Sequence, residues 1–188
     1  MRRDFTQRRR TFMNTLVSVT AKKCTTLEIG VAAGDFSNFM LDNLDIIEHH
    51  MVDPWINEGD HLRSQWFDQD KNDAEQTYMF VLERFKDRPV KIIRKLSNDF
   101  FRNNKTKYDL IYIDGDHHSI PVFNDLKNAM NCLKPNGVLC GDDYNWTSRS
   151  TGKQEVRIGV EMFEDEFNMK FNIVKGDNNG LNQYWYKF

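Results

Sequence analysis

Two short apolar runs separated by a predicted helix constrain the fold of this chain more than any other feature. The runs are DLIYI at 109–113 and GVLC at 137–140, and the segment between them has apolar residues at helical spacing around 120–133. Short apolar runs are typical of parallel strands that are buried on both faces, and a helix between two such strands predicts a βαβ unit. The sequence therefore predicts an α/β fold built around a mostly parallel sheet.

The same alternation of apolar runs and amphipathic segments continues along the rest of the chain. We expect strands at 25–29, 49–53, 90–94, 109–114, 137–141, 170–175 and 182–188, and helices at 4–21, 35–44, 73–87, 98–103, 120–133 and 156–168. Ser97 is expected to cap the helix at 98–103. Only the short connection GDNNGLN at 176–182 separates the last two strands, so they should form an antiparallel hairpin.

The predicted architecture is therefore a single Rossmann-like, doubly wound, mostly parallel sheet of seven strands with a C-terminal antiparallel hairpin. We divide the chain into an N-terminal helical segment, 1–24, and one α/β domain, 25–188. The sequence does not decide between a monomer and a homo-oligomer.

Size, charge and cysteine content exclude several classes of protein. The chain has 188 residues and a net charge of −2, which gives no overall attraction for nucleic acid. No apolar run approaches the roughly 18 residues of a membrane span, and we expect no signal peptide. The three cysteines show no metal-binding spacing, which favours a reducing compartment. We therefore expect a soluble, cytoplasmic protein.

Basic residues are concentrated at the start of the chain. The first ten positions contain Arg2, Arg3, Arg8, Arg9 and Arg10. Such a cluster is either a solvated helix face at a frayed terminus or an arm that binds an anionic acceptor or a partner. The sequence leaves both interpretations open.

Three carboxylates and an imidazole follow the two strands of the βαβ unit. Asp114 ends the first strand, His117 comes three residues later, and Asp142 and Asp143 follow the second strand. Because open α/β sheets bind ligands at the carboxyl ends of their strands, these side chains should share one crevice. Oxygen ligands beside an imidazole suit a hard divalent cation and a general base. The arrangement predicts an enzyme, although strand-end caps and a solvated turn would also explain these residues.

A glycine-containing turn follows the first predicted strand. In LEIGVAAGDFS, at 27–37, Gly30 and Gly34 flank a turn that a ligand could approach closely, and the next helix presents free N–H groups. The dinucleotide pattern G-x-G-x-x-G is absent. Glu28 would repel a pyrophosphate but suits an amine or a sulfonium. Asp53, at the end of the second strand, can bind both ribose hydroxyls unless it only forms an Asp-Pro turn.

With these motifs the sequence resembles the class I S-adenosylmethionine-dependent methyltransferases over about residues 25–188. LEIGVAAGDFS resembles their first motif, VDP contains their ribose-binding acid, and YDLIYIDGDH and GVLCGDDY resemble their fourth and fifth strands. The chain is most similar to the metal-dependent macrocin- and mycinamicin-type small-molecule O-methyltransferases. That group usually has a Glu-Asp pair where this chain has Asp142-Asp143.

The resemblance implies a complete set of site residues. Mg²⁺, or another divalent cation, would be bound by Asp114, Asp142 and Asp143, and the catalytic residues would be His117, as general base, and Asp114. The cofactor pocket would be formed by Glu28, Gly30, Ala32, Gly34, Asp53, Ser97, Asn98 and Asp114. These residues would transfer a methyl group from S-adenosylmethionine to a hydroxyl of a small molecule or sugar.

Other functions remain open from the sequence. The acceptor could be a nucleic acid or a phosphorylated molecule, or the chain could bind a cofactor without methyl transfer, or it could be a metal-dependent hydrolase. Three tryptophans on predicted loops, Trp55, Trp66 and Trp146, are either core residues or walls of an acceptor site. A cation with room for two substrate oxygens would favour a vicinal diol as the acceptor.

Overall fold

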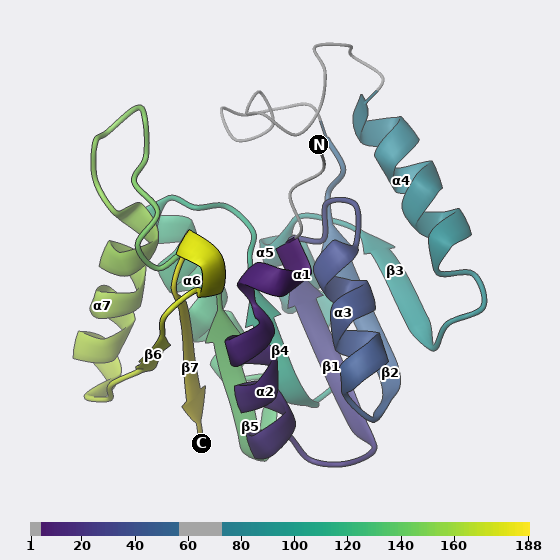
Figure 1. Cartoon of the computed structure of the whole chain (residues 1–188), viewed down its shortest axis with the longest axis horizontal. Helices are drawn as coiled ribbons and strands as arrows, with labels where there is room; N and C mark the ends of the chain where they lie inside the picture. The colour runs from purple at the N-terminus through teal and green to yellow at the C-terminus, as the bar shows by residue number, and fades with distance from the viewer. Residues whose placement is uncertain (1–4, 57–72) are drawn as a thin grey trace.

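The computed structural model describes residues 5–56 and 73–188, and these residues contain one seven-stranded sheet (Figure 1). The strands are β1 (Cys24–Ile29), β2 (Ile46–Asp53), β3 (Val90–Arg94), β4 (Tyr108–Ile113), β5 (Leu133–Gly141), β6 (Asn172–Val174) and β7 (Gln183–Lys187). Their order across the sheet is β3-β2-β1-β4-β5-β7-β6. Strands β1 to β5 pair in parallel, and β7 pairs antiparallel with both β5 and β6. The predicted fold class and its C-terminal hairpin are confirmed.

Helices cover both faces of this sheet (Figure 1). They are α1 (Phe5–Arg8), α2 (Arg10–Val19), α3 (Asp35–Asn43), α4 (Asp73–Arg84), α5 (Ser97–Asn103), α6 (Ser119–Met130) and α7 (Glu155–Phe167), with a short 3₁₀ helix η1 (Asp177–Asn179). Along the central strand β4, Ile111 and Ile113 pack with α6 and α7, whereas Leu110 and Tyr112 pack with α2 and α3. This alternation places one apolar core on each side of the sheet.

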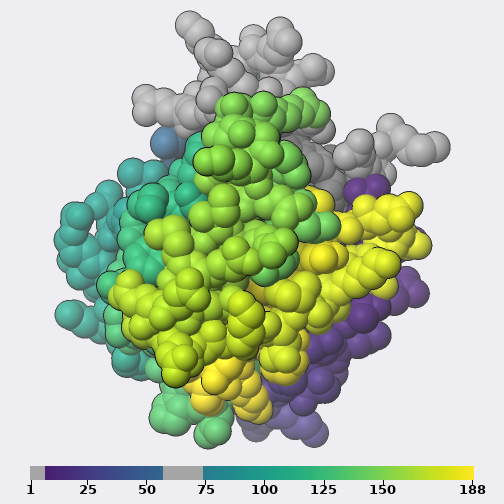
Figure 2. All heavy atoms as spheres, turned by 90° about the vertical axis from the view of Figure 1, so that its left-hand side faces the viewer, coloured from purple at the N-terminus to yellow at the C-terminus, as the bar shows by residue number. Residues whose placement is uncertain are grey.

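The N-terminal segment is part of that core. The helix predicted at 4–21 is interrupted at Arg9, whose backbone (φ −116°, ψ 16°) separates α1 from α2. Phe12 and Leu16 on α2 are completely buried against the sheet. The carboxylate of Asp177 in η1 accepts hydrogen bonds of 2.7 Å from both the backbone N–H and the hydroxyl of Thr11. The N-terminal and C-terminal segments therefore lie side by side (Figures 1 and 2).

Some element boundaries differ from the prediction. Strand β5 begins at Leu133, where the sequence predicted the end of a helix. Ser97 was expected to cap α5, but this was wrong: the capping position is Leu96, and Ser97 is the first helical residue. The Ser97 hydroxyl instead bonds to the carboxylate of Asp125 on α6. Trp66 lies outside the described residues.

Cys24, Cys132 and Cys140 are all buried and unbridged. Within residues 5–56 and 73–188, no helix has both the length and the apolarity to cross a bilayer.

The strand order determines where a ligand can bind. Because the chain crosses to opposite halves of the sheet from β1 and from β4, the order reverses between these two neighbours. Open α/β sheets bind ligands in the crevice outside the carboxyl ends of the strands at such a point. This edge, the upper one in Figure 1, contains the turn after β1 and the loops after β4 and β5.

Candidate functional site

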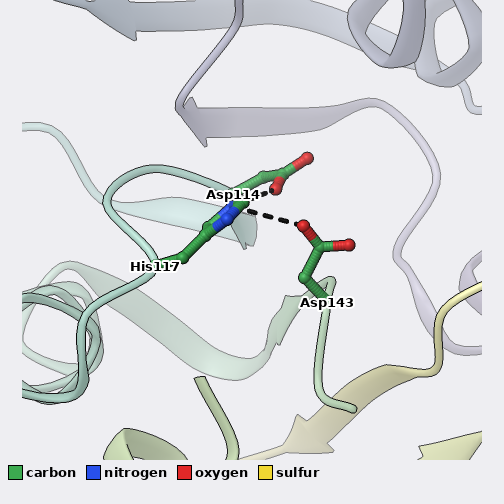
Figure 3. Close-up of side chains that lie close together, drawn as sticks. All are labelled: Asp114, His117 and Asp143. Carbon is green, nitrogen blue, oxygen red and sulfur yellow. Dashed lines mark hydrogen bonds and ion pairs between the residues drawn. The ribbon is translucent and has the colours of Figure 1, made fainter. Parts of the chain in front are cut away.

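Two carboxylates and one imidazole meet at the carboxyl ends of β4 and β5 (Figure 3). The Nε2 atom of His117 lies 3.4 Å from Oδ1 of Asp114 and 3.3 Å from Oδ2 of Asp143. One potential ligand atom from each residue lies within 4.8 Å of the others. Carboxylate and imidazole groups at this spacing can hold a divalent cation. The ring of Trp146 contacts His117 edge-on, with ring centroids 5.2 Å apart.

The two consecutive acids after β5 point in different directions. Asp143 has a left-handed backbone (φ 59°), a conformation that residues other than glycine rarely adopt. Its carboxylate faces His117. Asp142 directly follows β5, and its carboxylate faces Arg9 instead. Such backbone outliers are common at functional sites, where neighbouring structure compensates their strain.

Asp142 is surrounded by hydrogen-bond donors and is only 3% exposed. Its Oδ2 atom accepts hydrogen bonds from the Arg9 guanidinium and, at 3.2 Å, from the Tyr112 hydroxyl. Its Oδ1 atom accepts from the Gln183 amide and from the backbone N–H of Asp143, both at 2.8 Å. The structure thus brings Asp142 beside the cluster but engages both of its oxygens, and its role as a metal ligand stays a prediction.

Arg9 is the site residue that the sequence reasoning missed. Its side chain is 15% exposed, its guanidinium pairs with Asp142, and its Nη2 atom lies 3.7 Å from Oδ2 of Asp114. The guanidinium also stacks over the Phe36 ring, 5.5 Å from the centroid. A signal was present: Arg9 precedes Phe12 by three residues, which is the spacing of one helix face.

Burial and mutual repulsion change the protonation of the acid–histidine cluster. Burial acts to lower the pKa of His117, but its hydrogen bond with Asp114 and the charge of Asp143 raise it to about 9. Burial, together with the charge of Asp142, raises the pKa of Asp143 to about 7. Burial also raises the pKa of Asp114. Without another cation, the cluster therefore carries a protonated His117 at neutral pH.

The glycines after β1 are required by the chain itself. Gly30 has φ +85°, and a Cβ atom there would lie 2.0 Å from the carbonyl oxygen of Asp114. Gly34 has φ +77°, and its Cβ atom would lie 2.5 Å from the ring of Phe85, which directly follows α4. Ala32, between them, is exposed. The close approach expected from a ligand is thus already made by the residues that follow β4 and α4, and the cofactor role of these residues stays a prediction.

Asp53 fixes the same turn. Its Oδ2 atom accepts hydrogen bonds from the backbone N–H groups of Val31 (2.9 Å) and Ala32 (3.0 Å), and its Oδ1 atom accepts one from Trp55 (2.7 Å). Burial raises the pKa of Asp53, and these three N–H groups act to lower it. Trp55 is buried and donates its indole N–H to the Ala32 carbonyl, so it is a core residue. The ribose-binding role of Asp53 is not tested by these contacts.

Glu28 lies inside the fold. It is 1% exposed, accepts a hydrogen bond from the Ser37 hydroxyl, and lies 3.2 Å from Nε2 of His49. The other nitrogen of His49 is 2.7 Å from the Thr26 hydroxyl, so this buried histidine has a structural role. Burial raises the pKa of Glu28, whereas the bond to His49 acts to lower it. A contact between Glu28 and a cationic cofactor stays a prediction.

Ser97 and Asn98 lie on the carboxyl side of β3, at the start of α5. Ser97 contacts Asp125, which is 3% exposed. Burial raises the pKa of Asp125 to about 7, although the Ser97 hydrogen bond acts to lower it. Asn98 is exposed and accepts a hydrogen bond of 3.5 Å from Asn128. Both predicted cofactor-pocket residues are thus on the ligand-binding edge, and their role is untested.

Comparison with known proteins identifies the class that this fold and site define. A family model described as a methyltransferase domain matches residues 27–144, which is more than half of the chain. The chain therefore belongs to this methyltransferase family. A search of curated protein sequences found no match.

Solved structures share the fold over almost the whole chain. A protein from Clostridium thermocellum, provisionally described as an rRNA methylase, is 13% identical, with 97% of this chain and 98% of that chain covered and a TM-score of 0.66. A Staphylococcus aureus protein, provisionally described as a caffeoyl-CoA O-methyltransferase, is 18% identical, with 95% and 82% covered and a TM-score of 0.66. An O-methyltransferase from Bacillus cereus in complex with SAH is 14% identical, with 93% and 77% covered and a TM-score of 0.64. At these identities the likeness shows the fold alone.

Proposed function

We propose that this protein is an S-adenosylmethionine-dependent O-methyltransferase that acts on a hydroxyl group of a small molecule or sugar with the help of a divalent cation. The observation that carries the proposal is the cluster of Asp114, His117 and Asp143 at the carboxyl ends of two neighbouring strands of a methyltransferase domain. The buried, unbridged cysteines fit a cytoplasmic location.

S-adenosylmethionine would supply the methyl group. The crevice at the reversal between β1 and β4 is the expected place for it, and the related Bacillus cereus enzyme binds SAH. Exposed Ala32 lies on the turn that borders this crevice, and Asp53 holds that turn in position through its hydrogen bonds. The proposed cofactor-binding residues are Glu28, Gly30, Ala32, Gly34, Asp53, Ser97, Asn98 and Asp114.

A divalent cation such as Mg²⁺ fits the donor set of Asp114 and Asp143 and would lower the pKa of an acceptor hydroxyl. The resemblance also implies Asp142 as a ligand, although both of its oxygens accept hydrogen bonds from neighbouring donors. The Nε2 atom of His117, between the two carboxylates, is placed to take the hydroxyl proton. The contact with Trp146 holds the imidazole ring in that orientation.

A nucleic-acid acceptor is the second candidate, because the related Clostridium thermocellum protein is described as an rRNA methylase. The net charge of −2 argues against it, since sequence-independent binding to a polyanion depends on basic residues. RNA binding whose affinity falls steeply with added salt would favour this candidate. Its absence would support a small-molecule acceptor.

The test begins with calorimetric titration of S-adenosylmethionine and SAH in Mg²⁺ and in EDTA. We expect both ligands to bind in both conditions, followed by transfer of a labelled methyl group to a diol or sugar only in Mg²⁺. Asp143→Asn should abolish transfer and spare SAH binding, whereas the control Asp116→Asn, in the loop after β4 but outside the acid–histidine cluster, should keep both. Failure of both ligands to bind would overturn the proposal.

A further inference from the structure

The structure carries one further assignment at this site, and it concerns the N-terminal arginine. We propose that Arg9 is a positioning residue that binds Asp142 and keeps it out of the cation-binding set, so that Asp114 and Asp143 are the carboxylate ligands of the site. This inference rests on the cation dependence of the proposed function. It gives the N-terminal helical segment a role in the site.

Four hydrogen-bond donors surround the carboxylate of Asp142. A carboxylate offers about four lone-pair positions, two on each oxygen. Arg9 and Tyr112 donate to Oδ2, and Gln183 and the backbone N–H of Asp143 donate to Oδ1. A cation could bind Asp142 only by displacing one of these donors from a side chain that is 3% exposed. Asp143 has no such shell among the described residues, where its carboxylate is paired with His117.

The carboxylates of Asp142 and Asp143 point in different directions. Successive side chains of a strand point to opposite faces, so two adjacent acids at a strand end do not converge on one ion without a turn between them. Here the chain turns at Asp143 (φ 59°), which directs its carboxylate toward His117 and Asp114. The carboxylate of Asp142, the residue before this turn, meets Arg9 instead.

The net charge of the three carboxylates and Arg9 also supports this assignment. Three carboxylates crowd the site, and a guanidinium does not lose its proton in proteins. With His117 neutral, the three carboxylates and Arg9 carry two net negative charges, which one divalent cation balances. The guanidinium also lies 3.7 Å from Oδ2 of Asp114, while Oδ1 of the same residue faces His117. Asp114 therefore presents one oxygen to the arginine and the other to the cation-binding cluster.

Arg9 is held in place by its neighbours in the fold. The residues that follow it, Phe12 and Leu16, are completely buried, and Asp177 binds Thr11 at the start of α2. Phe36 on α3 lies under the guanidinium. An arginine held from three sides can act as a permanent counter-ion, which a mobile surface arginine cannot.

The experiment measures binding of Mn²⁺, as the probe cation, by electron paramagnetic resonance in the presence of SAH. Arg9→Gln removes a positive charge and should tighten Mn²⁺ binding by about tenfold, and Asp142→Asn should weaken it by about tenfold. The double variant R9Q/D142N removes the pair together and should bind within about threefold of the wild type. Asp114→Asn and Asp143→Asn should lose most of the affinity.

Two controls separate charge from damage to the fold. Arg10→Gln removes the same charge from an exposed neighbour and should leave the Mn²⁺ affinity unchanged, and Arg9→Lys should stay close to the wild type. Loss of a merely structural contact would weaken Mn²⁺ binding in Arg9→Gln, not tighten it. Thermal unfolding of each variant shows whether it is folded, and the charge-neutral double variant still decides the question if a single variant is not.

The inference is overturned if D142N and R9Q/D142N lose Mn²⁺ as completely as D114N does, because Asp142 is then a ligand. It is also overturned if the wild type binds SAH but no divalent cation. Titration of SAH in the same samples distinguishes these outcomes from a failure of the proposed function, in which SAH does not bind at all.

Discussion

At the scale of single residues, two positions near the ligand-binding edge depend closely on one neighbouring side chain. Asp125 is a buried acid that the Ser97 hydroxyl contacts. Gly34 occupies a left-handed backbone position directly against Phe85. Because each depends on few contacts, each can be tested with a single substitution and a matched control.

Asp125 makes the stability of the protein depend on pH. Its pKa is about 7 in the folded state, against about 3.9 for an unfolded chain, so the folded state keeps its proton to a higher pH. Stability should therefore fall as the pH rises from about 4 to 7, and Asp125→Asn should remove this loss. We expect the variant to be more stable than the wild type at pH 8 by up to about 4 kcal/mol, and nearly equal to it at pH 4. Urea unfolding at both pH values measures the difference.

The control for this prediction is Asp165→Asn, which changes an exposed acid on α7. As a substitution of an exposed side chain, it should change the free energy of unfolding by less than about 0.5 kcal/mol at pH 4 and at pH 8. A constant difference between Asp125→Asn and the wild type at pH 4 and pH 8 would contradict the assignment.

Gly34→Ala should destabilise the protein more than the loss of glycine flexibility alone explains. The new Cβ atom would lie 2.5 Å from the Phe85 ring at φ +77°, so both backbone strain and overpacking apply. We expect a loss of about 2–4 kcal/mol in the free energy of unfolding. Gly152→Ala is the matched control, because Gly152 has φ +68° with nothing within 4 Å of the new atom. Its loss should be about 1 kcal/mol, and equal losses would refute the clash.

Sequence reasoning at this scale identified the acids but not their directions. Asp114, His117 and Asp143 do meet, as strand ends in a parallel sheet predict. That Asp142 and Asp143 would diverge follows from strand alternation, but the left-handed turn at Asp143 that completes the cluster has no sequence signal beyond its residue type. Asp125 was not foreseen, because its partner Ser97 was taken for a helix cap.

At the scale of elements, α2 is the helix that connects the N-terminus to the site. Leu16 is 0% exposed among residues of α3, β4 and β5, whereas the adjacent Val17 is 51% exposed. The amphipathic spacing predicted a helix here but not the break at Arg9, since the start of α2 is stabilised by Asp177 from the far end of the chain. No local pattern can report a cap that comes from 166 residues away.

Leu16→Ala should destabilise the whole domain. It removes buried methyl groups and leaves a cavity beside β4, which lowers the free energy of unfolding by about 2–5 kcal/mol. Val17→Ala, one position along the same helix, should change it by less than about 0.5 kcal/mol. Chemical denaturation of both variants makes the comparison. Similar losses in the two would mean that α2 does not belong to the core, and that the N-terminal segment is an appendage.

At the scale of the whole molecule, the order of elements along the chain was enough to predict the class of fold. Alternating strands and helices imply parallel pairing, and the short connection 176–182 implied the antiparallel hairpin that the structure contains. The order of elements does not predict the contact between η1 and α2, because these segments lie 166 residues apart in the chain. Which helices cover each face of the sheet is known only from the assembled structure. The same holds for the placement of Arg9 over β4 and β5.

If the carboxyl edge of the sheet is the binding edge, hydrogen exchange in the presence of SAH should slow on that edge alone. The turn at 30–34, the junction at 95–98 and the loop at 114–118 follow β1, β3 and β4, so their amides should be protected by a ligand in the crevice. The segment 104–107 precedes β4 at the opposite edge and serves as the internal control. Mass spectrometry of these peptides with and without SAH makes the measurement. Protection of 104–107 comparable to that of 114–118 would place the ligand elsewhere or indicate general tightening of the fold, whereas protection confined to the three carboxyl-edge segments would locate the cofactor at the reversal of strand order.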